Sequence, residues 1–318
     1  RRIVSAVARG EPSTALVLTM TYLMHRGISR ADSRWSLRLR DALYRSAVSD
    51  GALANSLRVE PALGSPARGG LPDTVARRVG DGWELSGHKL YTTGIPALRW
   101  LAVWARTDES EPRVGVFLVP REAHGIRVIE SWDHLGLRAS GSHDITFREV
   151  EVPEDNLVEI AAQGPGAQQD NRALAALHLP LNALYLGVAR AAQRYFHRFA
   201  HERVPSNLGH PVAETERFRR AAGEIELLLD SAEQLVFGGA ERVDAGDDSY
   251  TAEQALGTKV LAARHATTAV ETAVRLLGNP GLSRANPLER HYRDIQCAPV
   301  HAPQDDIVLL ALGKAALG

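Results

Sequence analysis

The stretch VARRVGDGWELSGHKLYTTG, residues 75–94, shows most directly how the centre of this chain folds. Its apolar residues recur with a period of two on both sides of a Gly-Asp-Gly run at residues 80–82. Such a period is typical of a half-buried β-strand, and a glycine-rich pair between two strands indicates a hairpin turn. We therefore expect two antiparallel strands joined by a tight turn. The apolar residues that flank the turn are Val75, Val79, Trp83 and Leu85.

The same period continues on both sides of this hairpin. Further short apolar segments lie between Asp, Gly and Pro residues, which favour turns. These segments predict a mostly antiparallel β-domain of roughly a hundred residues, from 51 to 158. The expected strands are residues 100–105, 114–119, 126–129 and 145–152.

The ends of the chain change to helical spacing. Residues 1–50 predict helices, with Ser13 or Thr14 as an N-cap, and the chain begins at Arg1 within one of them. We therefore expect an N-terminal helical domain, 1–50, that is incomplete, and a C-terminal helical bundle, 159–318. Ser249 or Thr251 is the expected N-cap of the third long bundle helix. The expected helices of the bundle are residues 173–202, 213–244, 251–277, 287–293 and 305–317.

Composition restricts the classes of function. The chain has 318 residues, 44% of them hydrophobic, and a formal net charge of -1, which favours no nucleic-acid or membrane partner. A single cysteine, Cys297, fits a reducing, cytoplasmic environment. His197 and His201 have the i, i+4 spacing of metal ligands, but no third ligand accompanies them in the sequence. We expect a solvated helix face there and no metal.

Several short motifs occur in a fixed order along the chain. Together they resemble the acyl-CoA dehydrogenase superfamily. That resemblance implies an α+β fold with N-terminal helices, a central antiparallel β-domain and a C-terminal four-helix bundle. The motifs are EPALGS at 60–65, WELSGHKLYTTG at 83–94, GLRASGS at 136–142, VEVP at 150–153 and HYRD at 291–294.

The resemblance implies a flavin cofactor. By position, the hydroxyl and backbone N–H of Thr93 would face flavin N5 and O4, and Tyr91 takes the place of a family tryptophan. Ser65 and the backbone around Val59 would hold the pyrimidine edge. Such donors tune the flavin, while the flavin itself carries out the redox chemistry.

The part of the site that would bind the ADP half of FAD departs from the family pattern. Arg203 occupies the position of the family arginine, but Arg219 and Arg275 replace two glutamines, and Gly278-Asn279 replaces a Gly-Gly turn. Added guanidinium groups favour phosphate, so the motif indicates phosphate binding with loose adenine recognition. The expected cofactor is therefore FMN or FAD.

The proton-abstracting carboxylate of the dehydrogenases has no counterpart here. Its position in the tail is Ala302, whose methyl group cannot accept a proton. The alternative position on the first bundle helix is Leu177, beside His178. Asp305 and Asp306 follow closely, and we interpret them as an N-cap and helix-dipole partners of the terminal helix.

His301 precedes the lost base in a His-Ala-Pro tail. Flavin monooxygenases of this fold, such as dibenzothiophene monooxygenase and hydroxyphenylacetate hydroxylase, look similar there. An imidazole can donate or accept a proton near neutral pH, which suits oxygen transfer. The candidate catalytic residues are His301, Thr93 and, as a weaker candidate with Tyr22 beside it, His25.

These features favour a two-component monooxygenase that uses reduced flavin and O₂ on a small apolar or aromatic, sulfur or amine compound. A separate reductase would supply the flavin. One alternative is an acyl-CoA dehydrogenase, which desaturates an acyl-thioester, with an unusual base such as Asp305. Another is a catalytically inactive scaffold. Both enzymes imply a homo-oligomer, a dimer or a tetramer.

Overall fold

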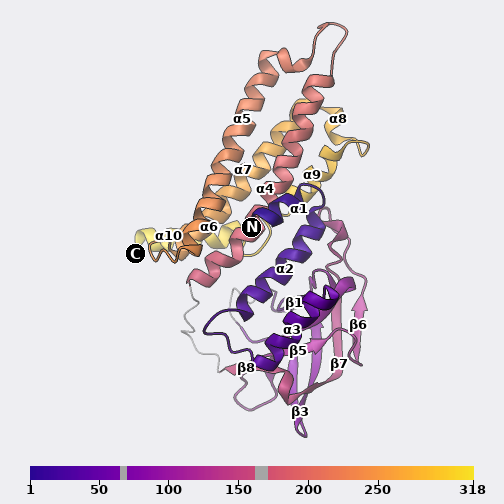
Figure 1. Ribbon diagram of the computed structural model, residues 1–318, viewed down its shortest axis with the longest axis vertical. Helices are drawn as coiled ribbons and strands as arrows, with labels where there is room; N and C mark the ends of the chain where they lie inside the picture. The colour runs from indigo at the N-terminus through magenta and orange to yellow at the C-terminus, as the bar shows by residue number, and fades with distance from the viewer. Residues whose placement is uncertain (65–69, 162–170) are drawn as a thin grey trace. The chain divides into compact units, whose positions relative to one another are not determined.

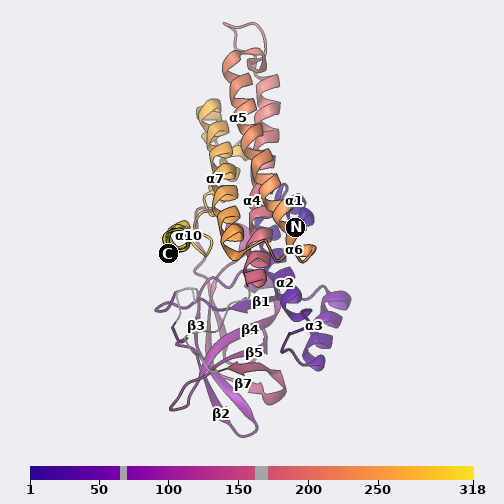
Figure 2. The same ribbon diagram turned by 90° about the vertical axis from the view of Figure 1, so that its left-hand side faces the viewer.

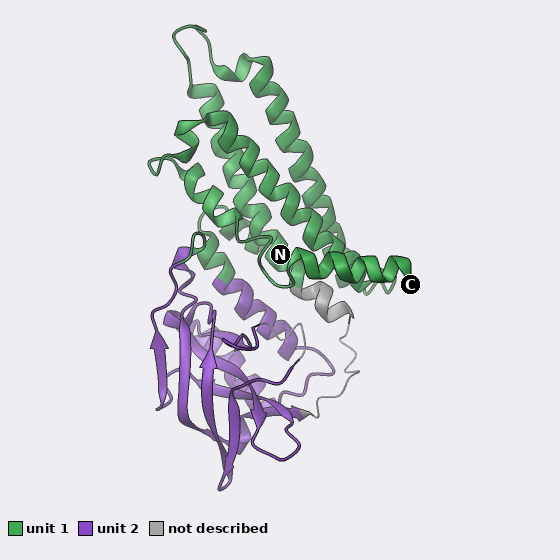
Figure 3. Ribbon diagram, turned by 180° about the vertical axis from the view of Figure 1, so that it is seen from behind, with its two compact units in different colours: residues 1–16, 134–137, 169–318 green, residues 17–133, 138–168 purple. Residues whose placement is uncertain are grey.

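The computed structural model describes residues 1–64, 70–161 and 171–318, without the side chains of 161 and 171–177. The chain forms two compact units (Figure 3). One contains residues 1–16, 134–137 and 169–318, and the other contains residues 17–133 and 138–168. The expected division into 1–50, 51–158 and 159–318 stays a prediction.

The first unit is helical. Its long helices α4 (Asn171–Glu202), α5 (Glu216–Glu233) and α7 (Ala252–Leu277) run side by side (Figures 1 and 2). Short helices complete it: α1 (Arg2–Ala8), α6 (Gly239–Asp244), α8 (Asn279–Leu282), α9 (Pro287–Ile295) and α10 (Asp305–Leu317). A π-helical segment, Gln234–Gly238, separates α5 from α6, so the single helix expected over 213–244 is interrupted.

Local sequence explains where these helices begin and how closely they pack. Thr251 and Gln254 form a capping box at the start of α7, as the Thr251 alternative predicted. At Gly187 on α4 a Cβ would lie 2.4 Å from the carbonyl oxygen of Ser5, so only glycine allows α1 to approach there. Among the described residues, no helix is long and apolar enough to cross a membrane.

The second unit is built on a sheet. In the described residues its eight strands have the order β6-β7-β3-β2-β4-β5-β8, and β1 pairs with β4. The pairs β1–β4 and β2–β4 are parallel and the others antiparallel, as expected. The strands are β1 (Leu53–Leu57), β2 (Val75–Val79), β3 (Gly82–Lys89), β4 (Leu98–Thr107), β5 (Val114–Pro120), β6 (Ile126–Ile129), β7 (Asp144–Pro153) and β8 (Leu157–Ala161).

Period-two alternation divides the core of this unit into two layers. On β4, Leu101 and Val103 belong to a cluster that fills one side of the sheet. Ala102 and Trp104, which alternate with them, pack with residues of α2 (Pro12–Ile28) and α3 (Leu37–Asp50). The predicted hairpin is confirmed, because Val79 pairs with Gly82 across a two-residue turn.

The expected start of α2 was wrong. The helix begins at Pro12, so Ser13 and Thr14 lie in its first turn and do not cap it. The carboxylate of Glu11 accepts a hydrogen bond from the backbone N–H of Thr14 instead. A carboxylate three residues before an N–H of the first turn does the same work as a capping hydroxyl.

Candidate functional site

The tail of the first unit brings His301 against Tyr185. Tyr185 is fully buried on α4, and its hydroxyl group hydrogen-bonds to Nδ1 of His301. Burial, followed by the charges of Cys297 and Asp294, raises the pKa of Tyr185 well above its ordinary value. The phenol therefore stays protonated, and its hydrogen bond to Nδ1 is compatible with either tautomer of the imidazole.

The same environment fixes the state of His301. Burial and then the positive charge of Lys259 lower the pKa of His301 to about 4, so the imidazole is neutral near pH 7. In the tautomer in which Nδ1 accepts from Tyr185, the ring proton resides on Nε2. In that tautomer His301 offers a hydrogen-bond donor at Nε2.

The carboxylates near Ala302 are engaged elsewhere. Asp305 pairs with Lys259 at 2.9 Å and with Arg264 at 3.4 Å. It is the first residue of α10 and Gln304 precedes it at the N-cap, so the expected N-cap role of Asp305 and Asp306 was wrong, although both lie in the first turn. The buried Asp294 accepts from the backbone N–H of Leu137 at 2.7 Å, and burial raises its pKa.

His178 lies beside the alternative base position. It is buried on α4, and burial followed by the charge of Lys259 lowers its pKa to about 4. Both of its ring nitrogens lack hydrogen-bond partners in the described part of the chain. The side chain of Leu177 lies outside the described residues.

In the second unit, Thr93 is at the centre of a cluster of buried polar side chains that are joined by hydrogen bonds. Its hydroxyl is 3.0 Å from Ser142 Oγ, which is 2.8 Å from Ser140 Oγ. Its carbonyl oxygen accepts from Asn55 Nδ2 at 3.1 Å, and its N–H donates to the Tyr91 carbonyl at 2.8 Å. These contacts hold the Thr93 backbone and hydroxyl in one arrangement.

The sequence also predicts flavin-ring contacts for Tyr91, Val59 and Ser65. Tyr91 has a left-handed backbone, with φ 53°, is 52% exposed and makes an edge contact with Trp132. The carbonyl of Val59 accepts from Leu90 N–H at 2.9 Å. Ser65 lies outside the described residues.

A buried ion pair supports the segment that holds Val59. Lys89 Nζ is 2.5 Å from Glu60 Oε1, and both side chains are fully buried. Burial lowers the pKa of Lys89 to about 8, although Glu60 opposes this shift. Burial alone would raise the pKa of Glu60, but hydrogen bonds from Lys89 and Thr74 bring it below its ordinary value.

His25 has a ring partner that the sequence analysis did not name. Its ring stacks on Tyr44 of α3 at a centroid distance of 5.5 Å, and burial lowers its pKa. Tyr22, the predicted neighbour, is 46% exposed. Sequence spacing within α2 could not identify a partner that a later helix supplies.

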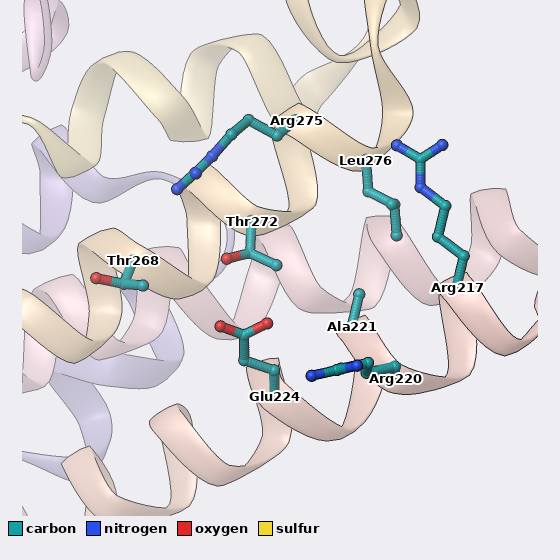
Figure 4. A pocket seen from close by; sticks show the side chains of 8 residues that line it. All are labelled: Arg217, Arg220, Ala221, Glu224, Thr268, Thr272, Arg275 and Leu276. Carbon is teal, nitrogen blue, oxygen red and sulfur yellow. The ribbon is translucent and has the colours of Figure 1, made fainter.

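The arginines predicted to bind phosphate separate into two sets. Arg275 on α7 lines an open groove of about 310 Å³ together with Arg217 and Arg220 of α5 (Figure 4). Arg219 is exposed on α5 and is not among the groove residues, and Arg203 is exposed just after α4. Sequence reasoning missed Arg217 and Arg220, although their i, i+3 spacing places them on one helix face. The remaining groove residues are Ala221, Glu224, Thr268, Thr272 and Leu276.

A second groove lies at the end of α7. It has a volume of about 380 Å³ and includes Arg275 and Gly278. Gly278 has φ 67° and no atom near the position of a Cβ, so its backbone is open to close approach by a ligand. The groove is completed by Glu271, Val274, Asn279, Leu282 and Tyr292.

Each unit, taken by itself, has polar groups of a kind that a flavin nucleotide can use. The hydroxyl of Thr92, beside Thr93, is buried without a partner among the described residues, as expected of a group that awaits a ligand. The guanidinium groups of the α5–α7 groove suit phosphate. The described residues contain no cluster of three or more potential metal ligands, and His197 and His201 are exposed.

Similarity to known proteins extends over the whole chain. Residues 58–150 match the acyl-CoA dehydrogenase middle domain, and residues 179–305 match the acyl-CoA dehydrogenase C-terminal domain. The Bacillus subtilis protein YdbM, whose name assigns it to the acyl-CoA dehydrogenases, is 34% identical over 311 residues, 98% of this chain and 80% of its own.

Solved structures agree in fold. Butyryl-CoA dehydrogenase from Megasphaera elsdenii has a TM-score of 0.85 at 23% identity, over 99% of this chain and 80% of its own. TdsC from Paenibacillus sp. A11-2, solved with FMN and indole, has a TM-score of 0.86 at 21% identity, over 99% and 82%. The α+β fold is confirmed, and the chain belongs to the acyl-CoA dehydrogenase family of flavin-dependent oxidoreductases.

Proposed function

We propose that this protein is a flavin-dependent monooxygenase that acts on a small organic compound. One observation carries the proposal: the phenol of Tyr185 occupies Nδ1 of His301, beside Ala302. A desaturase needs a free lone pair or a carboxylate to remove a proton, whereas oxygen transfer benefits from a donor to a developing negative oxygen. In this proposal, His301 of the His-Ala-Pro tail provides that donor.

The overall reaction balances without a carboxylate base. Bound flavin in its reduced form supplies two electrons to O₂, one oxygen atom enters the substrate, and the other leaves as water. The part of His301 is to present Nε2–H, and that of Tyr185 is to hold the imidazole in this tautomer. Burial of the Tyr185 hydroxyl limits competition from water for this hydrogen bond.

The cofactor and partners follow from the same proposal. We infer FMN or FAD, delivered in reduced form by a separate reductase, with Thr93, Tyr91, Val59 and Ser65 at the ring. Arg203, Arg219, Arg275 and Gly278 would contact the nucleotide end, and the protein would be a homo-oligomer. The flavin that copurifies, identified after denaturation, and the mass in solution by light scattering test these points.

Acyl-thioester desaturation is the second candidate, because YdbM, 34% identical, is named as a dehydrogenase. It would need a base other than residue 302, and the carboxylates of Asp294 and Asp305 are already bonded. Of the other candidate site residues, His25 has no assigned step in either reaction.

The test supplies reduced FMN or FAD under isotopically labelled O₂, with indole as the probe compound. The proposal expects labelled oxygen in the organic product and slower release of hydrogen peroxide than from free reduced flavin. His301→Ala should abolish the labelled product and accelerate peroxide release. Unlabelled organic product, with the same peroxide release in both proteins, would refute the proposal.

A further inference from the structure

One face of α4 carries three buried polar side chains. His178, Asn182 and Tyr185 stand at positions i, i+4 and i+7, the spacing that aligns side chains on one side of a helix. They are 3%, 4% and 2% exposed. A bundle helix ordinarily turns apolar residues to the interior, so three polar residues on this face need an explanation.

Two of the three have no internal partner. Both ring nitrogens of His178 and the Nδ2 atom of Asn182 are buried without a hydrogen-bond partner in the described residues. Tyr185 differs, because its hydroxyl is bonded to His301. Since nearly all buried polar atoms in folded proteins are paired, these unpaired atoms indicate a ligand that supplies the missing partners.

Charges of both signs act on this face, because Asp294 acts on Tyr185 and Lys259 acts on His178. Lys259, buried on α7, pairs with Asp305 at 2.9 Å, but Arg264 shares the same carboxylate at 3.4 Å. Lys259 and Arg264 therefore both pair with the single carboxylate of Asp305. After burial, the Lys259 charge is the second cause that lowers the pKa of both His178 and His301. A neutral histidine, an amide N–H and an ammonium group together favour an oxygen acceptor with negative charge.

We propose that His178, Asn182 and Lys259 bind an anionic oxygen of the substrate, a carboxylate or a phenolate. The inference rests on the proposed function, because it assigns this group to the molecule on which the enzyme acts. Tyr185, one turn from Asn182 on the same face, links the binding group to His301. The substrate would then be a small molecule with an acidic oxygen.

The first measurement separates binding from structural support. Asn182→Leu keeps the number and branching of the side-chain heavy atoms and removes an unpaired buried donor, so the denaturation midpoint should rise or stay unchanged. A residue kept for stability would behave in the opposite way, because its loss lowers the midpoint. A clear decrease in the midpoint of Asn182→Leu would overturn the proposal.

The second measurement is equilibrium binding by titration calorimetry, with benzoate, 4-nitrophenolate and neutral benzamide as probes. The wild-type protein should bind at least one anion about tenfold more tightly than benzamide, the ratio that 1.4 kcal/mol supplies. Lys259→Met and Asn182→Leu should each weaken that binding about tenfold or more. The exposed residues Lys314 and Asn207 give the matched controls Lys314→Met and Asn207→Leu, which should bind as the wild type does.

Each outcome decides the question. A carboxylate substrate is indicated if only benzoate binds, and a phenolate if only 4-nitrophenolate binds. Absence of binding by all three probes, or equal binding of benzamide, contradicts the proposal and leaves ordered water as the partner of His178 and Asn182. The assay needs neither O₂ nor reduced flavin, so its failure is distinct from a failure of the monooxygenase test.

Discussion

Tyr185 and His301 are 116 residues apart in the chain, yet the phenol of one hydrogen-bonds to Nδ1 of the other. Their ring centroids are 5.7 Å apart, and the rings are tilted by 52°. Because burial disfavours both ionisation of the phenol and protonation of the imidazole, the two groups are neutral near pH 7.

Removal of the phenol oxygen should affect catalysis more than stability. Tyr185→Phe leaves Nδ1 unbound, so the tautomer is no longer fixed, and we expect product formation to fall by up to about 100-fold. The free energy of unfolding should fall by only about 1 kcal/mol. Rates of product formation and urea denaturation measure the two effects.

Tyr250→Phe is the matched control. Tyr250 is a buried tyrosine of the same unit whose hydroxyl lies 3.1 Å from Thr258 Oγ1. It should lose a similar amount of stability and keep full activity. Equal activity losses in the two variants would show that the Tyr185 effect is general loosening of the bundle.

Acid should destabilise the protein through three of its histidines. The pKa values of His178, His291 and His301 are each lowered to about 4, mainly by burial, from an ordinary value of 6.5. Between these values the unfolded chain binds protons that the folded chain does not, so stability falls as pH falls from 6.5 to 4. Each histidine contributes up to about 1.4 kcal/mol per pH unit.

Urea denaturation at several pH values in this range measures that slope. His291→Leu should make the slope shallower, whereas the same change at the exposed His197 should leave it unaltered. A free energy of unfolding that stays constant from pH 6.5 to 4 would show that these imidazoles protonate freely in the folded protein.

The Lys89–Glu60 pair should be among the most sensitive points of the sheet unit. Lys89→Met leaves the Glu60 carboxylate buried without its cation, at a cost of about 3–5 kcal/mol. The double variant Lys89→Met/Glu60→Gln should be less destabilised, because no uncompensated charge remains. We would abandon this interpretation if the single variant lost under about 1 kcal/mol in guanidinium denaturation.

Thr93 should affect the flavin more than the fold. Thr93→Val keeps the shape but removes the hydroxyl that meets Ser142, at a cost of about 1 kcal/mol. If Thr93 also contacts the ring, the flavin should bind more weakly and its visible spectrum should shift, as titration with FMN and FAD would show. Thr146→Val, a strand threonine of β7, provides the control and should bind flavin normally.

Local signals in the sequence were enough for much of the fold. The Gly80-Asp81 turn and the period-two segments located the hairpin and its neighbours, and Thr251, one of the two expected N-caps, begins α7. The start of α2 was misplaced because Glu11, one residue before Pro12, takes the capping role. Carboxylates and hydroxyls compete for that role, and sequence alone does not rank them.

The candidate site was harder to predict, because its contacts are long-range. His301 could be selected from the tail pattern, but its partner Tyr185 could not, since no local spacing joins residues 116 positions apart. Likewise, Asp305 looked like a helix cap until the structure placed Lys259 of α7 against it. Side chains that reach across helices are set by packing, which a single sequence does not encode locally.

The most direct test of the central claim mixes the flavin-loaded protein with butyryl-CoA in the absence of O₂. The measured quantity is the visible absorbance of the oxidised flavin. The absence of a carboxylate at residue 302 predicts that the wild-type absorbance stays constant, while Ala302→Glu gains slow bleaching by the thioester. Rapid bleaching of the wild-type flavin would contradict the account and make the protein a desaturase with a base elsewhere.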